Sequence, residues 1–444
     1  MANQRSTLDQ FKESDKEGRH TSYENYKDVE YEQLGKIPTE WGIYKLKQVA
    51  DSFPSNVNKK EKENEPSIYL CNYTDVYHNT TITPDLDFME ATAKRSDIQK
   101  FRLEEGDVII TKDSESWDDI GIPSYVAHTM NDVICGYHLT HLKPDESLIN
   151  GKYLYYYLES EIGSHHFHTE ANGVTRYGLS VSGIKEAPIT VPPKDQQSLI
   201  VDFLDEKTQN INHLISKKNE LVQLLEEKRT SLIKDAVSNG IITDPDQKES
   251  GVEWLGEIPK YWEVKDLRYL ADVDTGGKDT KDAVDDGNYP FFVRSQTEER
   301  IDSYSHDGEA VLTAGDGVGV GKVFHYIDGK FDYHQRVYKI SDFHDDIHGK
   351  YLYYYLRANL KMEIFKNNAK STVDSLRMPM FKSFPIAFGD IEEQQAIVNY
   401  LDQQNEEIDN LIKKIEHGID RLKEYRTALI TNAVTGQIDV RGEM

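Results

Sequence analysis

The sequence predicts an α+β protein in which two mostly β inserts, each with a short helix, are held in a duplicated frame. Two long helices separate the inserts and pack as an antiparallel coiled coil. Three observations predict this fold class: the 444-residue chain contains an internal repeat, a long helical pattern closes each copy and is free of Gly and Pro in the first, and β-type runs punctuated by Gly and Asn fill the middle of each copy.

The composition is that of an ordinary soluble protein, with 37% hydrophobic and 29% charged residues, and the length allows two or three domains. No apolar stretch approaches the length of a membrane span, and the N-terminus lacks the apolar core of a signal peptide. The two cysteines, Cys71 and Cys135, form no C-x-x-C pair, which suits a reducing compartment and provides no zinc framework. We therefore expect a cytoplasmic protein with no membrane association.

The charge balance is strongly acidic, with 78 Asp and Glu against 52 Lys and Arg, a net charge of −26. Binding to DNA depends largely on cations that neutralise phosphates, so a DNA reader that acts alone should be more basic. A DNA-binding function therefore requires a local positive surface, a partner that supplies cations, or a high-salt habitat.

The internal repeat is clearest at the ends of each copy. A Leu-Gly-x-Ile-Pro-x-x-Trp box at residues 34–41 returns at 255–262, and the octapeptide GKYLYYYL at 151–158 returns letter for letter at 349–356. The middles match poorly, and the first copy is about 24 residues longer, with most of the excess between its two boxes. One scaffold with two different inserts suits a protein that recognises two different things.

The helical pattern runs from about residue 195 to 237 in the first copy and is cleaner in the second. Leucine and isoleucine recur at intervals of seven, interrupted in the first copy by Lys218. The positions in these two registers are Leu204, Ile211, Leu225 and Leu232 in the first copy, and Leu401, Ile408, Ile415, Leu422 and Leu429 in the second. A seven-residue repeat of this length predicts a coiled coil, with helices roughly 65 Å long.

Local signals predict where these helices begin and end. The pair Pro192-Pro193 precedes the first helix, and Gly240 ends it. Asp390, followed three residues later by Glu393, resembles a capping box for the second helix. Two stiff helices joined through a compact domain would most simply pack antiparallel and set the distance between the inserts.

Short runs rich in Val, Ile, Tyr and Phe predict that each insert is mostly β. Residues 107–111 and 309–313 are predicted to be buried strands, and the glycine-rich residues 315–322 a turn that leads into a hairpin. Asp328-Gly329 and Gly308 are predicted to mark further turns. The tyrosines of the GKYLYYYL octapeptide could stack on bases, but their helical spacing and their repetition favour a role in the core.

Motifs of enzymes that act on nucleotides or DNA are missing or incomplete. A phosphate-binding loop around 315–322 fails, because Asp316 stands where glycine is required and Val323 where Ser or Thr should follow the lysine. The only Pro-Pro pair lacks the flanking residues of an amino-methyltransferase box, which argues against catalysis of methyl transfer.

Two patterns could in principle hold a metal ion. Pro245-Asp246 followed by residues 263–265 (EVK) formally fits a Mg²⁺-dependent nuclease, but it lies in the repeated junction, and the first copy has Gly42 and Tyr44 at the matching places. Residues 165–168 (HHFH) could bind a metal, but without cysteine or paired carboxylates at ligand spacing we expect a polar loop. We predict no metal site and no catalytic site.

The repeated boxes resemble the specificity subunits of type I restriction-modification enzymes. The Leu-Gly-x-Ile-Pro-x-x-Trp box that opens each half resembles the start of their target recognition domains. A strand that leads into a long helix with a Gln-rich start, at 192–197 and 391–395, and Arg-Thr-x-Leu-Ile near each helix end complete the resemblance. It covers residues from about 26 to 440, and the chain departs from it in its acidity and in its charged N-terminal tail.

The resemblance implies a non-catalytic subunit that binds double-stranded DNA. Each insert would read one half of a split, asymmetric target, and the coiled coil would set the unread gap and dock two methyltransferase subunits. Restriction subunits with motor and nuclease activity would complete the enzyme. No cofactor would bind to this chain, because S-adenosylmethionine, ATP and Mg²⁺ belong to the partner subunits, and the partners' cations would offset the acidity.

The resemblance also gives the chain a division into parts. These are a charged tail (1–25), a first target recognition domain (26–191), a first long helix (192–240), a junction with the second target recognition domain (241–388), a second long helix (389–436) and a C-terminal tail (437–444).

Base readers are expected to be polar side chains on loops, with Arg or Lys for guanine and Asn or Gln for adenine. The candidates are Lys112, Ser114, Arg176 and Tyr177 in the first insert, and Arg294, Gln296, Lys322 and Arg336 in the second. The alternative for each is a solvated side chain or one paired with the abundant acids.

Two other functions fit part of the sequence. A coiled-coil adaptor that never touches DNA explains the helices and the acidity, but not the two different inserts in one duplicated frame. A fused enzyme with its own cleavage centre needs motifs that the chain lacks. The adaptor predicts no salt-sensitive DNA affinity in any complex, and the fused enzyme predicts Mg²⁺-dependent cleavage by the chain alone.

Overall fold

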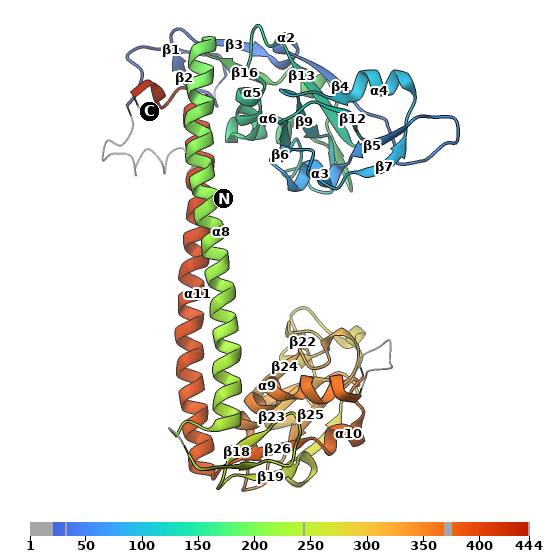
Figure 1. The fold of residues 1–444 in the computed structure, drawn as a ribbon, viewed down its shortest axis with the longest axis vertical. Helices are drawn as coiled ribbons and strands as arrows, with labels where there is room; N and C mark the ends of the chain where they lie inside the picture. The colour runs from blue at the N-terminus through green and yellow to red at the C-terminus, as the bar shows by residue number, and fades with distance from the viewer. Residues whose placement is uncertain (1–20, 32, 243–244, 368–374, 443–444) are drawn as a thin grey trace. The chain divides into compact units, whose positions relative to one another are not determined.

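The computed structural model describes residues 21–31, 33–242, 245–367 and 375–442 (Figure 1). Its contacts divide the chain into two compact units, Met1–Lys217 with His417–Met444, and Lys218–Glu416. Each unit combines one β-rich insert with a part of each long helix, which confirms the predicted fold class. Residues 1–20 of the predicted tail lie outside the described residues. Across the described ranges, every helix is too short or too polar to span a bilayer.

The two long helices are α8 (Lys194–Asn239) and α11 (Ile391–Val434). Helix α8 begins directly after the predicted Pro-Pro pair, and Gly240 follows it in the left-handed conformation, with φ of 74°. At the start of α11, the Asp390 carboxylate accepts a hydrogen bond from the Glu393 backbone N–H at 2.8 Å. The Glu393 carboxylate accepts from Tyr261 and Trp262 instead of closing the predicted capping box.

Within each unit, α8 and α11 lie side by side with opposite directions. In the first unit Arg426 Nη1 donates to Asn212 Oδ1 at 2.6 Å, and in the second Arg229 pairs with Asp409 at 2.5 Å. The predicted seven-residue registers face inward to different degrees. Leu204, Ile211, Leu401, Ile408 and Leu429 are buried, and Leu225, Leu232, Ile415 and Leu422 are half-buried.

The insert of the first unit is built on two sheets. A five-stranded sheet has the order β4-β13-β9-β11-β6, and a four-stranded sheet has the order β7-β5-β12-β8. The strands of this unit are β1 (Tyr26–Asp28), β2 (Lys36–Pro38), β3 (Gly42–Lys45), β4 (Ala50–Pro54), β5 (Ser67–Cys71), β6 (Thr81–Ile82), β7 (Met89–Thr92), β8 (Arg102–Leu103), β9 (Val108–Thr111), β10 (Asp113–Ser114), β11 (Pro123–Val126), β12 (Met130–Cys135), β13 (Leu139–Pro144), β14 (Asn172–Gly173), β15 (Tyr177–Gly178) and β16 (Pro188–Val191). Its short helices are α2 (Leu46–Val49), α3 (Tyr73–His78), α4 (Arg95–Phe101), α5 (Gly151–Glu159), α6 (Glu161–Glu170) and α7 (Val181–Lys185).

The insert of the second unit has one six-stranded sheet, in the order β20-β25-β23-β24-β21-β22. Its strands β20, β25 and β23 repeat the neighbour order of β4, β13 and β9, so the longer first insert differs mainly by its additional sheet. The strands are β17 (Gln247–Glu249), β18 (Glu257–Pro259), β19 (Glu263–Asp266), β20 (Asp272–Thr275), β21 (Tyr289–Phe292), β22 (Glu299–Ile301), β23 (His306–Ala314), β24 (Phe324–Tyr333), β25 (Val337–Ser341) and β26 (Pro385–Phe388). The helices are α9 (Gly349–Asn367) and α10 (Met378–Lys382).

The repeated tyrosines join each insert to the long helices. Tyr153 of α5 is fully buried, and its hydroxyl donates to the carbonyl oxygens of Thr190 and Val434, each at 3.1 Å. Tyr351 of α9 is equally buried; its hydroxyl donates to Ala387 O of β26 at 2.7 Å and lies 3.5 Å from Val237 O of α8. These contacts confirm the predicted core role of the octapeptide over stacking on bases.

Two local predictions are wrong. The HHFH segment is part of helix α6 and not a polar loop, because Ser160 caps the helix and Phe167 is buried against the insert. Asp328-Gly329 and Gly308 are not turns, because Gly308 and Gly329 face each other in the continuous β23–β24 ladder. Both glycines have positive φ, 144° and 141°, and the ladder continues through them without a reversal of the chain.

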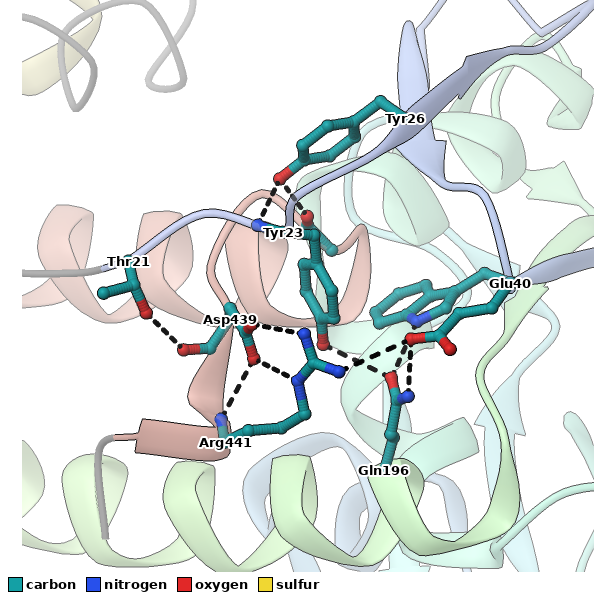
Figure 2. Close-up of polar contacts among 9 residues, drawn as sticks. Thr21, Tyr23, Tyr26, Glu40, Gln196, Asp439 and Arg441 are labelled. Atoms are coloured by element: carbon teal, nitrogen blue, oxygen red, sulfur yellow. Dashed lines mark hydrogen bonds and ion pairs between the residues drawn. The ribbon is translucent and has the colours of Figure 1, made fainter.

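The described ends of the chain meet in the first unit (Figure 2). The Thr21 hydroxyl donates to Asp439 O at 3.1 Å, and Tyr26 donates to Gly436 O at 3.0 Å. Arg441 pairs with Asp439, and its guanidinium lies 4.8 Å from the centre of the Tyr23 ring. These contacts hold the hairpin β1–β2 against the residues that follow α11. The equivalent hairpin of the second unit, β17–β18, comes after α8 in the chain.

Candidate nucleic-acid interface

The candidate residues of each insert gather around the end of its central strand. In the first insert Thr111, the last residue of β9, faces Leu139, the first residue of β13. In the second insert Ala314, the last residue of β23, faces Val337, the first residue of β25. The loop that leaves one strand and the loop that enters its neighbour therefore emerge side by side in both inserts.

The first surface brings Ser114, Arg176 and Tyr177 together. Ser114 of β10 is the register partner of Tyr177 of β15, and Arg176 precedes that strand. Ser114 is only 8% exposed, and its hydroxyl accepts a hydrogen bond from Ser116 N, so it is the least accessible of the four candidates. Lys112 is half-buried, donates to Ser55 O at 3.2 Å, and lies 5.3 Å from the centre of the Tyr137 ring.

Arg176 is held by a histidine that sequence reasoning did not single out. Its Nη2 lies 3.2 Å and 3.4 Å from the two ring nitrogens of His138. His138 Nδ1 in turn lies 2.6 Å from Asp113 Oδ2, and the histidine has the left-handed φ of 72° that few residues other than glycine adopt. Asp113, His138 and Arg176 therefore form one chain of contacts, in which Nε2 is the ring atom that can accept from Arg176 when Nδ1–H donates to Asp113.

These residues line an open hollow of about 420 Å³. Its lining is Tyr73, Asp113, Ser114, Glu115, Asp119, His138, Thr175 and Arg176. Burial and the nearby Asp119 raise the pKa of Tyr73, so its hydroxyl stays protonated and able to donate. With three carboxylates against one arginine, the hollow offers acceptors for base amino groups as well as a donor.

The second surface centres on a carboxylate between two arginines. Arg294 Nη1 lies 2.9 Å from Asp316 Oδ1, and Arg336 Nη1 lies 3.2 Å from Asp316 Oδ2. Both guanidinium groups stay partly exposed, and each keeps further N–H groups for a ligand. Gln296 donates to Phe324 O at 3.2 Å, which places it near the exposed Lys322.

His334 holds the backbone of Arg336 in place. Its Nδ1 accepts a hydrogen bond from the Arg336 backbone N–H at 3.0 Å. Burial, together with the nearby Arg294, lowers the pKa of His334, so the ring is neutral and can accept.

Each surface also presents an exposed valine that sequence reasoning missed. Val174 is 89% exposed and lies two residues before Arg176, and Val318 is 88% exposed and lies two residues after Asp316. Among the described large apolar side chains these are the two most exposed, followed by Tyr269 at 60%. Apolar side chains beside base readers are suited to contact the methyl group of thymine.

The two patterns considered for metal binding can be compared with the described part of the chain. No group of three or more His, Cys, Asp and Glu residues is arranged to hold a metal ion among the described residues. In the formal nuclease pattern, the Lys265 ammonium pairs with Glu263 at 3.0 Å and with Asp346 at 2.9 Å.

Comparison with known proteins identifies the family. Residues 38–224 and 259–421 match the family described as type I restriction modification DNA specificity domain. The type I restriction enzyme EcoDI specificity subunit of Escherichia coli is 32% identical over 183 residues, which are 41% of this chain and 40% of that subunit. The MjaVIII specificity subunit of Methanocaldococcus jannaschii is 20% identical over 94% of this chain and 97% of its own length.

A solved structure has the same fold. This chain superposes with a TM-score of 0.67 and 16% identity on a chain from work on the complex assembly and conformational transition of the type I R-M system, covering 92% of this chain and 99% of the other. Because the family match spans both halves and most of the sequence, this protein belongs to the type I restriction-modification DNA specificity family, as a specificity subunit.

Proposed function

We propose that the two inserts read the two halves of a split, asymmetric DNA sequence and that the long helices set the unread gap between the halves. The observation that carries this proposal is the pair of surfaces at the ends of β9 and β23. They occupy the same place in a duplicated frame, but one presents Arg176 and the other presents Arg294 and Arg336. Different donors at equivalent places would recognise different base pairs.

The chain is proposed to act without catalysing a reaction, in a complex that contains two methyltransferase subunits and restriction subunits. S-adenosylmethionine, ATP and Mg²⁺ would bind to those partners and not to this chain. Four exposed leucines on the long helices are the residues that we propose for contact with these partners. They are Leu214 in the first unit, and Leu221, Leu224 and Leu411 in the second.

The net charge of −26 fits such a complex better than a chain that binds DNA alone. Phosphate contacts supply much of the affinity of DNA-binding proteins, and partner subunits can provide the cations for them. We also propose that the complex acts in the cytoplasm, where it would meet DNA.

The experiment is to purify the chain from its host together with its bound partners and to select duplexes from a random DNA pool. Recovery of a methyltransferase and enrichment of a two-part motif with a constant gap would support the proposal. Recovery without a methyltransferase, or a complex that enriches no sequence, would leave the coiled-coil adaptor as the better account. Cleavage of DNA by the chain alone with Mg²⁺ would favour the fused enzyme.

A further inference from the structure

The two reading surfaces share an arrangement that their sequences do not share. Asp113 lies two residues after the end of β9, and His138 lies directly before β13. Asp316 lies two residues after the end of β23, and Arg336 lies directly before β25. In both inserts, a carboxylate on the outgoing loop contacts a basic side chain on the incoming loop.

Each carboxylate is also linked, directly or through His138, to an arginine from a further segment of its insert. Asp316 binds Arg294 directly at 2.9 Å. Asp113 reaches Arg176 only indirectly. It lies 2.6 Å from His138, and the His138 ring contacts Arg176. The flanking residues differ, Lys112 and Ser114 in one insert against Gly315 and Gly317 in the other, so the arrangement does not follow from the repeated sequence boxes.

A surface that binds DNA of any sequence needs attraction to phosphates, and a carboxylate at this place weakens that attraction. For the recognition of bases, however, the carboxylate has a benefit. An arginine held by a carboxylate loses less conformational entropy on binding, and its free N–H groups point in a fixed direction. Offsetting its charge also reduces binding to the phosphates of any sequence.

We propose that Asp113 and Asp316 are positioning residues that fix the arginines of the two surfaces, so that each surface discriminates between bases instead of binding any DNA. This inference rests on the proposed function, since it assumes that these surfaces contact DNA. Asp113 would serve the half of the target that the first insert reads, and Asp316 the half that the second insert reads.

The test compares Asp316→Asn with Asp328→Asn in the full chain and its purified complex. Asp328 is an exposed residue of β24 in the same insert, so its substitution removes the same charge elsewhere. Affinities are measured for random duplex DNA, for the selected target, and for targets with single base-pair changes in each half, at several salt concentrations.

We expect Asp316→Asn to lower the preference for the correct base pairs by on the order of tenfold, a typical effect of one base pair, and only in the half read by the second insert. The affinity for random DNA should rise more than in Asp328→Asn, with a steeper dependence on salt because the freed arginines reach phosphates. Asp113→Asn should affect only the other half, and Asp316→Glu, which keeps the carboxylate, should retain most of the preference.

A double-mutant cycle separates positioning from the loss of charge. In an Arg294→Ala, Arg336→Ala background, Asp316→Asn should no longer change the preference for any base pair. If it still does, or if Asp316→Asn and Asp328→Asn behave alike in the wild-type background, the inference is overturned. Failure of the proposed function gives a different result, because the wild-type complex would then select no split sequence at all.

Discussion

Arg229 of α8 and Asp409 of α11 form an ion pair at 2.5 Å that ties the two long helices together within the second unit. The arginine side chain is only 13% exposed, so water screens it less than a typical surface pair. In the first unit the equivalent contact joins Arg426 to Asn212, a neutral partner, at 2.6 Å. The duplicated frame has thus kept the position of this contact and changed its charge.

Replacing Asn212 by Asp should therefore stabilise the first unit. We expect a gain of about 0.5 to 1 kcal/mol in the free energy of unfolding, because a neutral hydrogen bond becomes an ion pair. Chemical denaturation at low and high salt checks this, and the gain should shrink as salt rises. Asp409→Asn is the matched control and should destabilise the second unit; equal stability of all three proteins would contradict the role of this contact.

Removing the arginines of the second surface should weaken reading of one half of the target only. Arg294→Ala and Arg336→Ala are each expected to cost about 1 to 3 kcal/mol of discrimination at a base pair of that half. Binding of the complex to single base-pair variants of the selected target measures this. Lys330→Ala, an exposed lysine of β24, removes the same charge and should lower affinity similarly for all sequences. A uniform loss in the arginine variants would mean that they contact only phosphates.

The exposed valines should contact thymine methyl groups in the DNA target. If Val318 contacts a thymine methyl group, replacing that thymine by uracil in the target should weaken binding, and Val318→Ser should weaken it to the same extent. In the variant, the uracil target should bind as well as the thymine target, since the contact is already lost. The same comparison with Val174→Ser tests the first insert. Uracil substitutions without effect at every thymine would exclude this contact.

The tyrosine hydroxyls that join inserts to helices should contribute to stability. Tyr153→Phe removes the buried donor to Thr190 O and Val434 O and should cost about 1 kcal/mol or somewhat more. Tyr351→Phe should behave alike in the second unit, where Ala387 O loses its donor. Thermal unfolding measures both. The control Tyr69→Phe alters an exposed side chain and should change stability little; a similarly small change at Tyr153 would contradict the proposed anchoring.

Acid should weaken the contact between Glu186 and the lysines before β4. Hydrogen bonds from Lys45 and Lys47 lower the pKa of Glu186 from 4.5 to about 2. The folded-state value is depressed, so the stabilisation is fully present above pH 4.5 and is lost as pH falls towards 2. The stability difference between wild type and Glu186→Gln should therefore be constant above pH 4.5 and shrink below it. Glu63→Gln, at an exposed position, serves as the control, and a difference that grows in acid would contradict the assignment.

The helices and the central strands could be predicted from the sequence because their signals are local. The leucine registers of α8 and α11, the Pro-Pro pair before α8 and the strand at 107–111 depend on neighbours within a few residues. The turn predicted at Asp328-Gly329 failed for the opposite reason. A glycine signal does not say whether the chain reverses or whether two distant glycines, here Gly308 and Gly329, meet in a ladder.

The repeat, the coiled-coil registers and the family resemblance were determined by the sequence alone, since each is a pattern along the chain. Only the tertiary structure decided that Asp316 lies between Arg294 and Arg336, and that Asp113 contacts His138 and through it Arg176. These partners are 20 or more residues apart, and strand register brings them together. Register is set by the packing of whole strands, and for that reason no local pattern around either aspartate revealed its partner.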